Sequence, residues 1–291
     1  MNKMVSIVLL NWNGKQILEN CLNSIKKNTS YPNYEIILVD NGSKDSSVEM
    51  VKKNFPEVKI IKNPENYGIP KASNQGTKMA KGDYIIFMSN DTLATNGWMN
   101  GLVEAINKDK KISSVAATLI ESKNYGKIKR EAIEEEKESV CSATMIVTRK
   151  AWENVGEYDE ENFTPYGGDE TDWNYRARNM GYKVMKTRRA FVHHIGHHDT
   201  KKQNPNQYFL LHYNTWKAIF FNSSLKQFFK RLPGQGLLFL NSFKYGKTLT
   251  LLRVYLTILI NLPSFLKYIK QRKLKVQEAK KQQQVQGINW F

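Results

Sequence analysis

The chain has 291 residues, of which 41% are hydrophobic, enough for one large α/β domain with an appendage or for two modest domains. Lysines and arginines total 44 against 27 aspartates and glutamates, so the net charge of +17 predicts an anionic partner: nucleic acid, a membrane surface or a phosphorylated substrate. Cys21 and Cys141 lie far apart without CxxC spacing, which argues against a disulfide framework or a thiolate zinc site and fits a reducing cytoplasm. The apolar stretch after Lys3 is too short for a signal peptide, so we expect a first strand there.

The first ninety residues alternate between strand and helix patterns. Apolar runs predict strands at 4–10, 35–39, 58–61 and 85–88. Helices are expected between them: one with its apolar stripe over 17–25, a short one over 48–55 capped by Ser43 or Asp45, and one over 69–81. This alternation predicts right-handed crossovers and an α/β fold with a mainly parallel central sheet.

Beyond residue 91 the pattern is less regular. We expect helices at 98–108 and 169–180, and strands at 114–120, 142–148 and 183–185, with a last strand ending at Val192-His193-His194. The charged segment 131–138 is predicted to be a solvated loop or an exposed helix. A first domain is therefore expected to span residues 1–205.

Residues 206–291 differ in kind, since aromatic and aliphatic side chains alternate with lysines and arginines. We expect a basic helical extension. Its most apolar stretch, Leu249 to Leu262, is about 14 residues long, short of the roughly 20 needed to span a bilayer. The pattern predicts a segment that lies on a membrane surface, and the alternative is a set of helices packed on the first domain with solvated lysine faces.

Polar residues collect where the predicted strands end. They are Asn11 and Asn13, Asp40 and Ser43, Asn66 with Asn74, and Asn90 with Asp91. In open α/β sheets ligands bind at the carboxyl ends of the strands, although Asn90-Asp91 could equally be a simple turn. A carboxylate such as Asp40 could accept from a uracil or thymine imide or a ribose hydroxyl, and Asp91 could bind a divalent cation, Mg²⁺ or Mn²⁺, that neutralises a diphosphate. The absence of GxxxxGK[ST] and GxGxxG patterns disfavours an ATPase or a nicotinamide enzyme.

Four segments in this order resemble the family 2 glycosyltransferases of GT-A fold: 5–14, 37–45, Asn66-Tyr-Gly with Asn74, and Ser89-Asn90-Asp91. The resemblance covers roughly residues 4–200 and implies one Rossmann-like nucleotide-binding domain. It implies that the nucleotide of a UDP- or dTDP-sugar is held by the first loop and by the aspartate after the second strand. The implied nucleotide-sugar-binding residues are Asn11, Asn13, Asp40, Asn66, Lys71, Asn74 and Asn90.

The Asp-X-Asp metal motif of that family is matched only at its last position, because Ser89 replaces the first aspartate. The resemblance implies that a histidine after the last core strand completes the site with Asp91, and His194 fits that pattern best. Neighbouring residues of a strand face opposite sides, so His193 and His194 cannot both point at one ion. A zinc site built from the histidines at 193, 194, 197 and 198 is an alternative, disfavoured because catalytic zinc ligands are usually spaced more widely.

The Asp169-Glu170 pair resembles the acidic pair that supplies the catalytic base in this family, in reversed order, so either residue could act. Carboxylates at a helix start are also favoured by the helix dipole alone. Asp172 and Arg176, four residues apart, are predicted to form an intrahelical ion pair. Trp173 and Tyr166 could each stack on a sugar, or they could belong to the core.

These observations predict a metal-dependent, inverting glycosyltransferase at the cytoplasmic face of the plasma membrane. It would move a sugar, with rhamnose the first candidate, to a hydroxyl of a growing, lipid-linked cell-surface glycan, without a nucleic-acid partner. A sugar nucleotidyltransferase is the first alternative, but Asn-Trp-Asn-Gly at 11–14 is a poor match to its Gly-rich basic loop. A non-catalytic membrane-binding or nucleic-acid-binding protein would explain the charge but not the polar strand ends.

Overall fold

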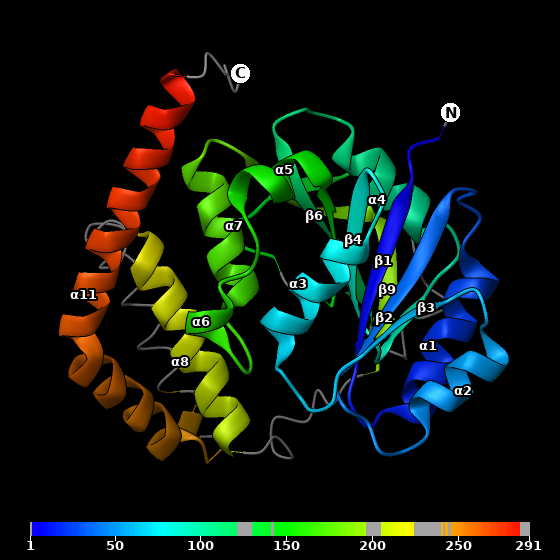
Figure 1. Cartoon of the computed structure of the whole chain (residues 1–291), viewed down its shortest axis with the longest axis horizontal. Helices are drawn as coiled ribbons and strands as arrows, with labels where there is room; N and C mark the ends of the chain where they lie inside the picture. Colours follow the sequence, from blue (N-terminus) through cyan, green and yellow to red (C-terminus); the bar gives the residue numbers. More distant parts are fainter. Residues whose placement is uncertain are drawn as a thin grey trace. The chain divides into compact units, whose positions relative to one another are not determined.

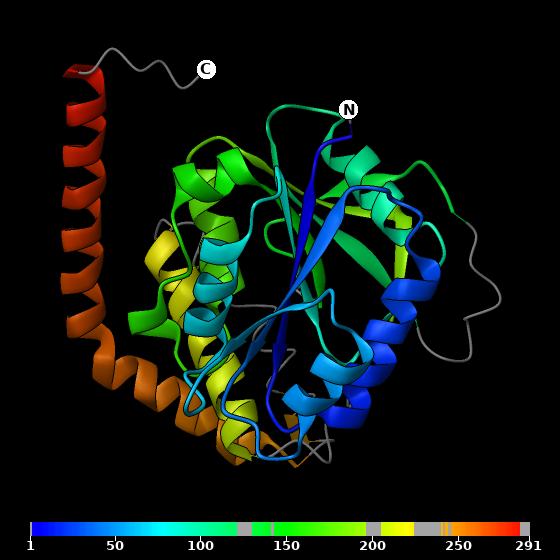
Figure 2. The same ribbon diagram turned by 45° about the vertical axis from the view of Figure 1, so that its right-hand side comes forward.

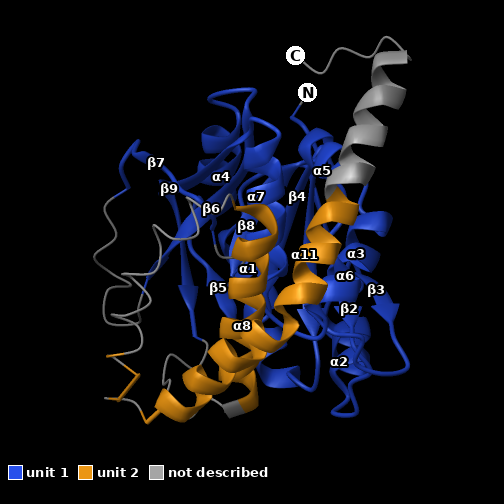
Figure 3. Cartoon of the chain, turned by 90° about the vertical axis from the view of Figure 1, so that its left-hand side faces the viewer, with its two compact units in different colours: residues 1–203 blue, residues 204–291 orange. Residues whose placement is uncertain are grey.

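The computed structural model describes residues 2–120, 130–140, 143–195, 205–223, 240, 242–243 and 246–285. The chain divides into two compact units, residues 1–203 and residues 204–291 (Figure 3). The first unit carries the sheet, and the described residues of the second unit are mainly helical.

One sheet organises the first unit, and within the described residues it contains nine strands. They are β1 (Val5–Asn11), β2 (Tyr34–Asp40), β3 (Lys59–Lys62), β4 (Tyr84–Ser89), β5 (Thr92–Ala94), β6 (Ile112–Ile120), β7 (Glu134–Glu136), β8 (Thr144–Thr148) and β9 (Lys183–His194). The order is β3-β2-β1-β4-β8-β6-β9-β5, and β7 pairs with β9.

The predicted parallel arrangement is confirmed for the first four strands. β1 pairs in parallel with both β2 and β4, and β2 pairs in parallel with β3. Beyond β4 the sheet is mixed, because β8 runs antiparallel to β4 and β6 while β6 and β9 are parallel. The order of the strands therefore switches sides at β1. β2 and β3 lie on one side of β1, and β4 and the later strands lie on the other.

Helices cover both faces of this sheet (Figures 1 and 2). In chain order they are α1 (Lys15–Asn28), α2 (Ser47–Asn54), α3 (Ile69–Met79), α4 (Trp98–Ile106), α5 (Arg149–Val155), α6 (Glu160–Phe163) and α7 (Asp169–Asn179). Alternate strand residues divide between two apolar cores: Leu9 packs with α1, α2 and α4, whereas Val8 shares its core with Trp152 of α5 and Trp173 of α7. Gly76 lets α3 approach β1, since a Cβ there would lie 2.4 Å from Val8 Cγ1.

Three local predictions are wrong. The charged segment contains a strand, β7, because Glu134 accepts hydrogen bonds from Lys108 and from Arg189 on β9. The two short strands predicted after residue 182 are one continuous strand, β9. Of the two caps predicted for α2, Ser43 is wrong, because its hydroxyl bonds to the loop after β1. The N-cap position is Ser46, and Asp45 Oδ1 accepts from the N–H of Ser47, the first residue of the helix, at 3.1 Å.

The second unit contains α8 (Pro205–Asn222) and α11 (Thr248–Val285) among its described residues. The apolar part of α11 is longer than predicted: Thr248–Arg272, 25 residues, is long and apolar enough to cross a membrane, judged by length and composition alone. Pro263 and the lysines after it interrupt the apolar run of the sequence at Leu262, but the helix continues through them.

Candidate active site

The carboxyl ends of β1 and β4 lie side by side at the topological switch point of the sheet, where the strand order changes sides. This is the usual position of a ligand crevice in an open α/β sheet. Asn11 ends β1 and Asn90 follows β4, and the Asn90 Nδ2 donates to the Asn11 Oδ1 at 2.9 Å. Gly14 lies against this bond, since a Cβ there would come within 2.8 Å of both amide groups. The first loop and the Ser89-Asn90-Asp91 segment are thus held together by one hydrogen bond.

Asp40 lies fully buried beneath the first loop. Its Oδ2 accepts from Asn11 Nδ2 at 3.0 Å, and its Oδ1 accepts from the backbone N–H of Ser43 at 2.9 Å. The Ser43 hydroxyl accepts from Asn11 Nδ2 at 3.1 Å and from the Asn13 N–H at 2.8 Å. Asn13 Oδ1 in turn accepts from the N–H of Lys44 at 2.8 Å. Three predicted site residues, from two strand ends, therefore form one network through Ser43.

A second group of amides, of which the sequence singled out only Asn66, continues this network. Asn41 Nδ2 donates to Asn66 Oδ1 and to the Gly68 carbonyl, each at 3.3 Å. Asn63 Nδ2 donates to Asn41 Oδ1 at 2.9 Å, and Asn63 and Gln75 exchange two hydrogen bonds. The only sequence signal was position, because Asn41 and Asn63 directly follow strands.

Lys71 and Asn74 lie on α3, but they make different contacts. The Lys71 ammonium lies 4.0 Å from the centre of the Tyr67 ring and is exposed. Asn74 is buried, and its amide both donates to the Tyr158 carbonyl at 2.9 Å and accepts from the Tyr158 N–H at 3.0 Å. The Asn74 side chain therefore ties α3 to the segment before α6.

Gly68 brings the start of α3 against the loop that leads into α7. Its φ is +81°, and a Cβ there would lie 2.8 Å from the Pro165 Cα. The N–H of Ile69 donates to the Pro165 carbonyl at 2.9 Å. Four residues later Asp169 begins α7, so the predicted acidic pair follows directly on a loop anchored at the Asn66–Gly68 turn.

Asp91 lies in the turn between β4 and β5, and the pairing of β5 with β9 places His194 opposite Thr92. His194 Nε2 lies 3.1 Å from Asp91 Oδ1, both side chains being about three-quarters buried. His193 pairs with Leu93, one register position away. Residues 197 and 198 lie outside the described residues, and among the residues that are described no group of three or more His, Cys, Asp or Glu could hold a metal.

A carboxylate and an imidazole suit a divalent cation that takes its other ligands from a diphosphate and water, so the donor set fits the metal that the motif implies. A thiol lies close to the Asp91 carboxylate. The Cys21 thiol is buried beside it, and burial, together with the charge of Asp91, raises the pKa of that thiol. Cys21 is therefore a neutral packing group rather than a ligand.

Asp169 and Glu170 open α7 and differ in accessibility. Asp169 is almost fully buried, and its Oδ2 has no hydrogen-bond partner among the described residues. Burial, and next the neighbouring Glu170 charge, raise the pKa of the Asp169 carboxyl well above its usual value. Glu170 is only half-buried. The pair thus combines a buried acid with a more accessible carboxylate.

The rest of α7 is structural. The predicted Asp172–Arg176 ion pair is confirmed at 2.8 Å, and Arg176 also donates to the carbonyls of Val155 and Glu157. Trp173 is fully buried and stacks on Trp152 with ring centres 5.5 Å apart. Core packing therefore replaces the sugar-stacking alternative for Trp173.

Trp12 is a further candidate that the sequence reasoning passed over. Its side chain is 59% exposed, although it lies between Asn11 and Asn13, which are both hydrogen-bonded to Ser43. An exposed indole on a loop fixed at both sides is a rigid stacking surface.

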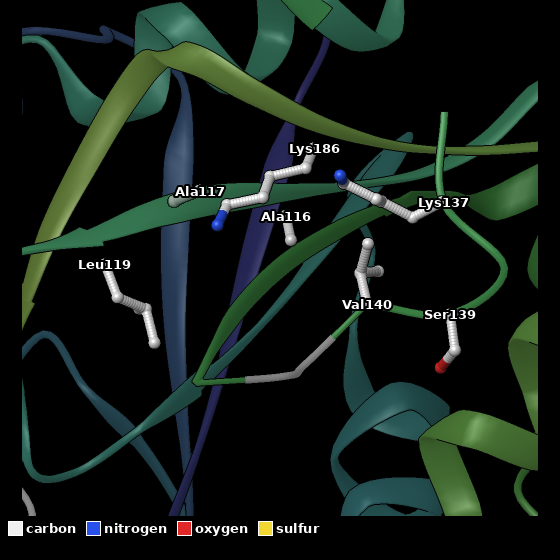
Figure 4. A pocket seen from close by; sticks show the side chains of 7 residues that line it. All are labelled: Ala116, Ala117, Leu119, Lys137, Ser139, Val140 and Lys186. Carbon is white, nitrogen blue, oxygen red and sulfur yellow. The ribbon is translucent and has the colours of Figure 1, made fainter. Parts of the chain in front are cut away.

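A pocket of about 260 Å³ lies elsewhere on the first unit (Figure 4). Its lining residues are Ala116, Ala117, Leu119, Lys137, Ser139, Val140 and Lys186. None of the predicted site residues lines it, so the strand ends and this pocket are distinct features.

Curated relatives match parts of the chain. The poly(ribitol-phosphate) β-glucosyltransferase of Bacillus spizizenii is 38% identical over 92 residues, which cover 30% of this chain and 14% of that protein. Glycosyltransferase GlyG of Streptococcus pneumoniae is 32% identical over 111 residues, 36% of each chain. Glycosyltransferase AglE of Haloferax volcanii is 25% identical over 207 residues, 66% of this chain and 65% of AglE. This chain thus matches about a third or less of the length of the first two.

Two solved structures share the fold. GalNAc-T7 with UDP, GalNAc and Mn²⁺ superposes with a TM-score of 0.61 at 18% identity, covering 75% of this chain and 47% of that one. The mannosyltransferase PcManGT from Pyrobaculum calidifontis, in complex with GDP-Man and Mn²⁺, gives 0.64 at 13% identity, covering 93% and 84%. At these identities the likeness establishes the GT-A fold alone.

The family model described as glycosyl transferase family 2 matches residues 6–228. That span contains all of the sheet except Val5, together with every residue of the strand-end network. The expected family and fold are both confirmed: the chain belongs to glycosyl transferase family 2.

Proposed function

We propose that the protein transfers a sugar from a UDP- or dTDP-sugar to a hydroxyl of a glycan acceptor with inversion at the anomeric carbon. The observation that carries this proposal is the Asn90–Asn11 hydrogen bond, which joins the network around Asp40 to the Asp91–His194 pair at the switch point of the sheet. A nucleotide and its diphosphate need such neighbouring sites, one for the base and ribose and one for the phosphates.

The nucleoside is proposed to lie along the first loop. Trp12 stacks on the base, and the exposed Asn13 and Asn66 border the ribose side with Lys71 close to the phosphates. Each Asp40 oxygen accepts one hydrogen bond within the network and keeps a lone pair for an imide or a ribose hydroxyl. Because Asp40 is fully buried, a direct contact requires the segment around Ser43 to move aside.

Asp91 and His194 are proposed to hold the divalent cation, and the imidazole favours Mn²⁺ over Mg²⁺. When bound, the cation neutralises the charge that develops on the leaving nucleoside diphosphate. Asn90 and Asn11 keep Asp91 in register with the first loop, and Asn74 holds α3 in place.

Glu170 is proposed to be the general base. The acceptor oxygen attacks the anomeric carbon from the face opposite the diphosphate, its proton passes to the Glu170 carboxylate, and the bond from that carbon to the diphosphate oxygen breaks. A base must be ionised and reachable, and burial favours the protonated form of Asp169. Asp169 is therefore proposed to position Glu170.

The acceptor is proposed to be a growing cell-surface glycan carried on a lipid at the cytoplasmic membrane face, with rhamnose as the first donor sugar to test. The named activity of the Bacillus spizizenii relative, glucosyl transfer to a poly(ribitol-phosphate), adds phosphate-containing polymers to the acceptor panel. The basic residues after position 205 support an anionic acceptor or surface.

Release of free nucleotide from a panel of UDP-, dTDP- and GDP-sugars, measured with Mn²⁺ and with a chelator, tests the proposal. We expect release from one UDP- or dTDP-sugar that requires the metal and is lost in Glu170→Gln when acceptor is present. Release of pyrophosphate from a nucleoside triphosphate and a sugar phosphate would instead establish a nucleotidyltransferase. No turnover of any donor with an acceptor panel present would contradict both.

A further inference from the structure

Helix α11 presents a stripe of exposed apolar side chains. The members of this stripe are Leu249, Leu252, Leu256, Leu259, Ile260 and Leu266. They recur mostly at intervals of three or four residues and therefore share one face of the helix. Their exposed fractions run from 41% at Leu252 to 81% at Leu249, and only three residues of the apolar segment Thr248–Arg272 are buried.

The opposite face of α11 is already occupied by α8. Leu251 and Val254 are fully buried, and the Phe265 ring lies edge-on to the ring of Phe221 with centres 5.4 Å apart. Tyr268 extends this cluster, with its ring centre 4.5 Å from that of Phe221. The guanidinium of Arg253 lies 4.5 Å from the Phe209 ring. α11 therefore has a packed face and an apolar face with nothing among the described residues to cover it.

The positive charge of residues 205–291 indicates which kind of surface the exposed stripe of α11 can bind. Residues 205–291 carry fourteen lysines and arginines against a single carboxylate, Glu278. Lys267 and Lys270 follow the stripe at helical spacing from Ile260 and Leu266, so positive charge continues along the same face. An apolar strip that passes into a basic one is typical of helices that lie in the interface of an anionic membrane.

We propose that the exposed stripe of α11 binds an anionic lipid surface, with the helix axis lying in the plane of that surface and α8 remaining packed behind it. A spanning orientation would require α11 to leave the aromatic cluster around Phe265 and to carry Arg253 into hydrocarbon. This inference adds a docking surface to the proposed function, but binding to lipid does not depend on donor turnover, so each can fail without the other.

Flotation of the purified full chain tests the proposal directly, with vesicles of phosphatidylcholine alone and of equimolar phosphatidylcholine and phosphatidylglycerol. We expect the protein to float with the anionic vesicles, to remain at the bottom with the neutral ones, and to be released by high salt or alkaline carbonate. Leu256→Glu with Ile260→Glu should lower the partition coefficient at least about tenfold, because two large aliphatic side chains no longer enter the interface.

The matched control replaces two equally apolar and comparably exposed residues of the first unit, Ile17→Glu with Ile133→Glu, which are 42% and 41% exposed. It should float like the wild type, and circular dichroism should show that both double variants are folded. Equal flotation of the Leu256/Ile260 variant and the wild type overturns the proposal. So does binding that resists carbonate, which indicates a spanning helix, or a wild-type dimer that the variant converts to monomer without any lipid binding.

Discussion

Two groups of polar side chains at the same edge of the sheet differ in how their hydrogen-bonding capacity is used. In the closed group, built around Asn11, Asp40 and Ser43, each side chain bonds to another side chain or to backbone. In the open group, the Asp91 carboxylate lies against the His194 imidazole, and Asp169 keeps a buried oxygen without a hydrogen-bond partner among the described residues.

The difference separates positioning from chemistry. A buried polar group left unsatisfied is costly, and native proteins keep such groups mainly where they react or bind. The closed group therefore positions the first loop. We expect the cation at Asp91 and the transferred proton at Glu170, beside the buried Asp169.

Replacing Glu170, the proposed general base, should have the largest effect. Glu170→Gln is expected to lower kcat for sugar transfer by about 10²–10⁴-fold, because proton removal from the acceptor loses its carboxylate. The KM for the donor should change little, as measured by steady-state kinetics. Glu161→Gln, an exposed residue of α6, is the control. A larger loss of kcat in Asp169→Asn than in Glu170→Gln would reverse the assignment of the two carboxylates.

Removing a proposed metal ligand should come next. Asp91→Asn and His194→Ala are each expected to weaken Mn²⁺ binding by at least about 100-fold, since even residues that only orient ligands contribute 10–100-fold. The measurement is the Mn²⁺ dependence of nucleotide release together with the EPR signal of free Mn²⁺. His193→Ala, on the same strand, should behave like the wild type. Unchanged Mn²⁺ affinity in both ligand variants would remove the metal assignment.

Removing one amide of the second group, which continues the closed group, should lower the stability of the fold more than it lowers kcat. Asn41→Ala removes one of the two acceptors of the buried Asn63 Nδ2 and one of the two donors to the Gly68 carbonyl, so the free energy of unfolding should fall by about 1–3 kcal/mol. Urea denaturation measures this loss. Asn20→Ala, on the exposed face of α1, should change the unfolding midpoint very little. An Asn41→Ala variant as stable as the wild type would show that the network is not needed for folding.

Trp12→Ala should separate binding from stability. Loss of a base-stacking surface is worth about 1–3 kcal/mol, so the KM for the donor should rise roughly tenfold or more. The side chain is 59% exposed, and the unfolding midpoint should therefore remain unchanged. Trp12→Phe, which keeps an aromatic face, should recover most of the affinity. A donor KM that is the same in Trp12→Ala and the wild type would exclude stacking.

Asp169 should show a small but distinctive pH dependence of stability. Folding raises the pKa of the Asp169 carboxyl above 3.8. At pH values between 3.8 and the raised pKa, the folded state therefore keeps a proton that the unfolded state has released. Stability from this group is present at low pH and is lost as pH rises. Asp169→Asn removes this pH-dependent loss of stability. The melting temperature of the variant, relative to that of the wild type, should therefore be higher at pH 7 than at pH 4. A gain that is equal at both pH values would contradict the raised pKa.

The sequence was most informative where one residue pattern decides the structure. The apolar runs that form β1, β2 and β4 predicted their own strands and placed Asn11, Asp40 and Asp91 at one edge, because parallel strands share that edge. The i, i+4 spacing of Asp172 and Arg176 likewise predicted their ion pair, since helix geometry alone brings them together.

What the sequence could not predict depends on partners far along the chain. β7 forms from three glutamates because β9 offers an edge and Arg189 offers a charge, neither of which is visible in residues 131–138. In the sequence Asn41 looks like an ordinary turn residue, and only the folded structure places Asn63 and Gly68 beside it. Helical periodicity placed Trp173 equally well in the core or at a sugar, and only the stacking on Trp152 decides between them.

The close approach of Gly68 to Pro165 has a consequence for engineering new specificities. The turn that ends at Gly68 and the loop that precedes the acidic pair fit together with no room for a single methyl group. A loop transplanted from a related enzyme into 164–168 must therefore reproduce the backbone shape of its new neighbour as well as its own sequence. Libraries that vary both segments together should yield active chimaeras more often than libraries that vary either one alone.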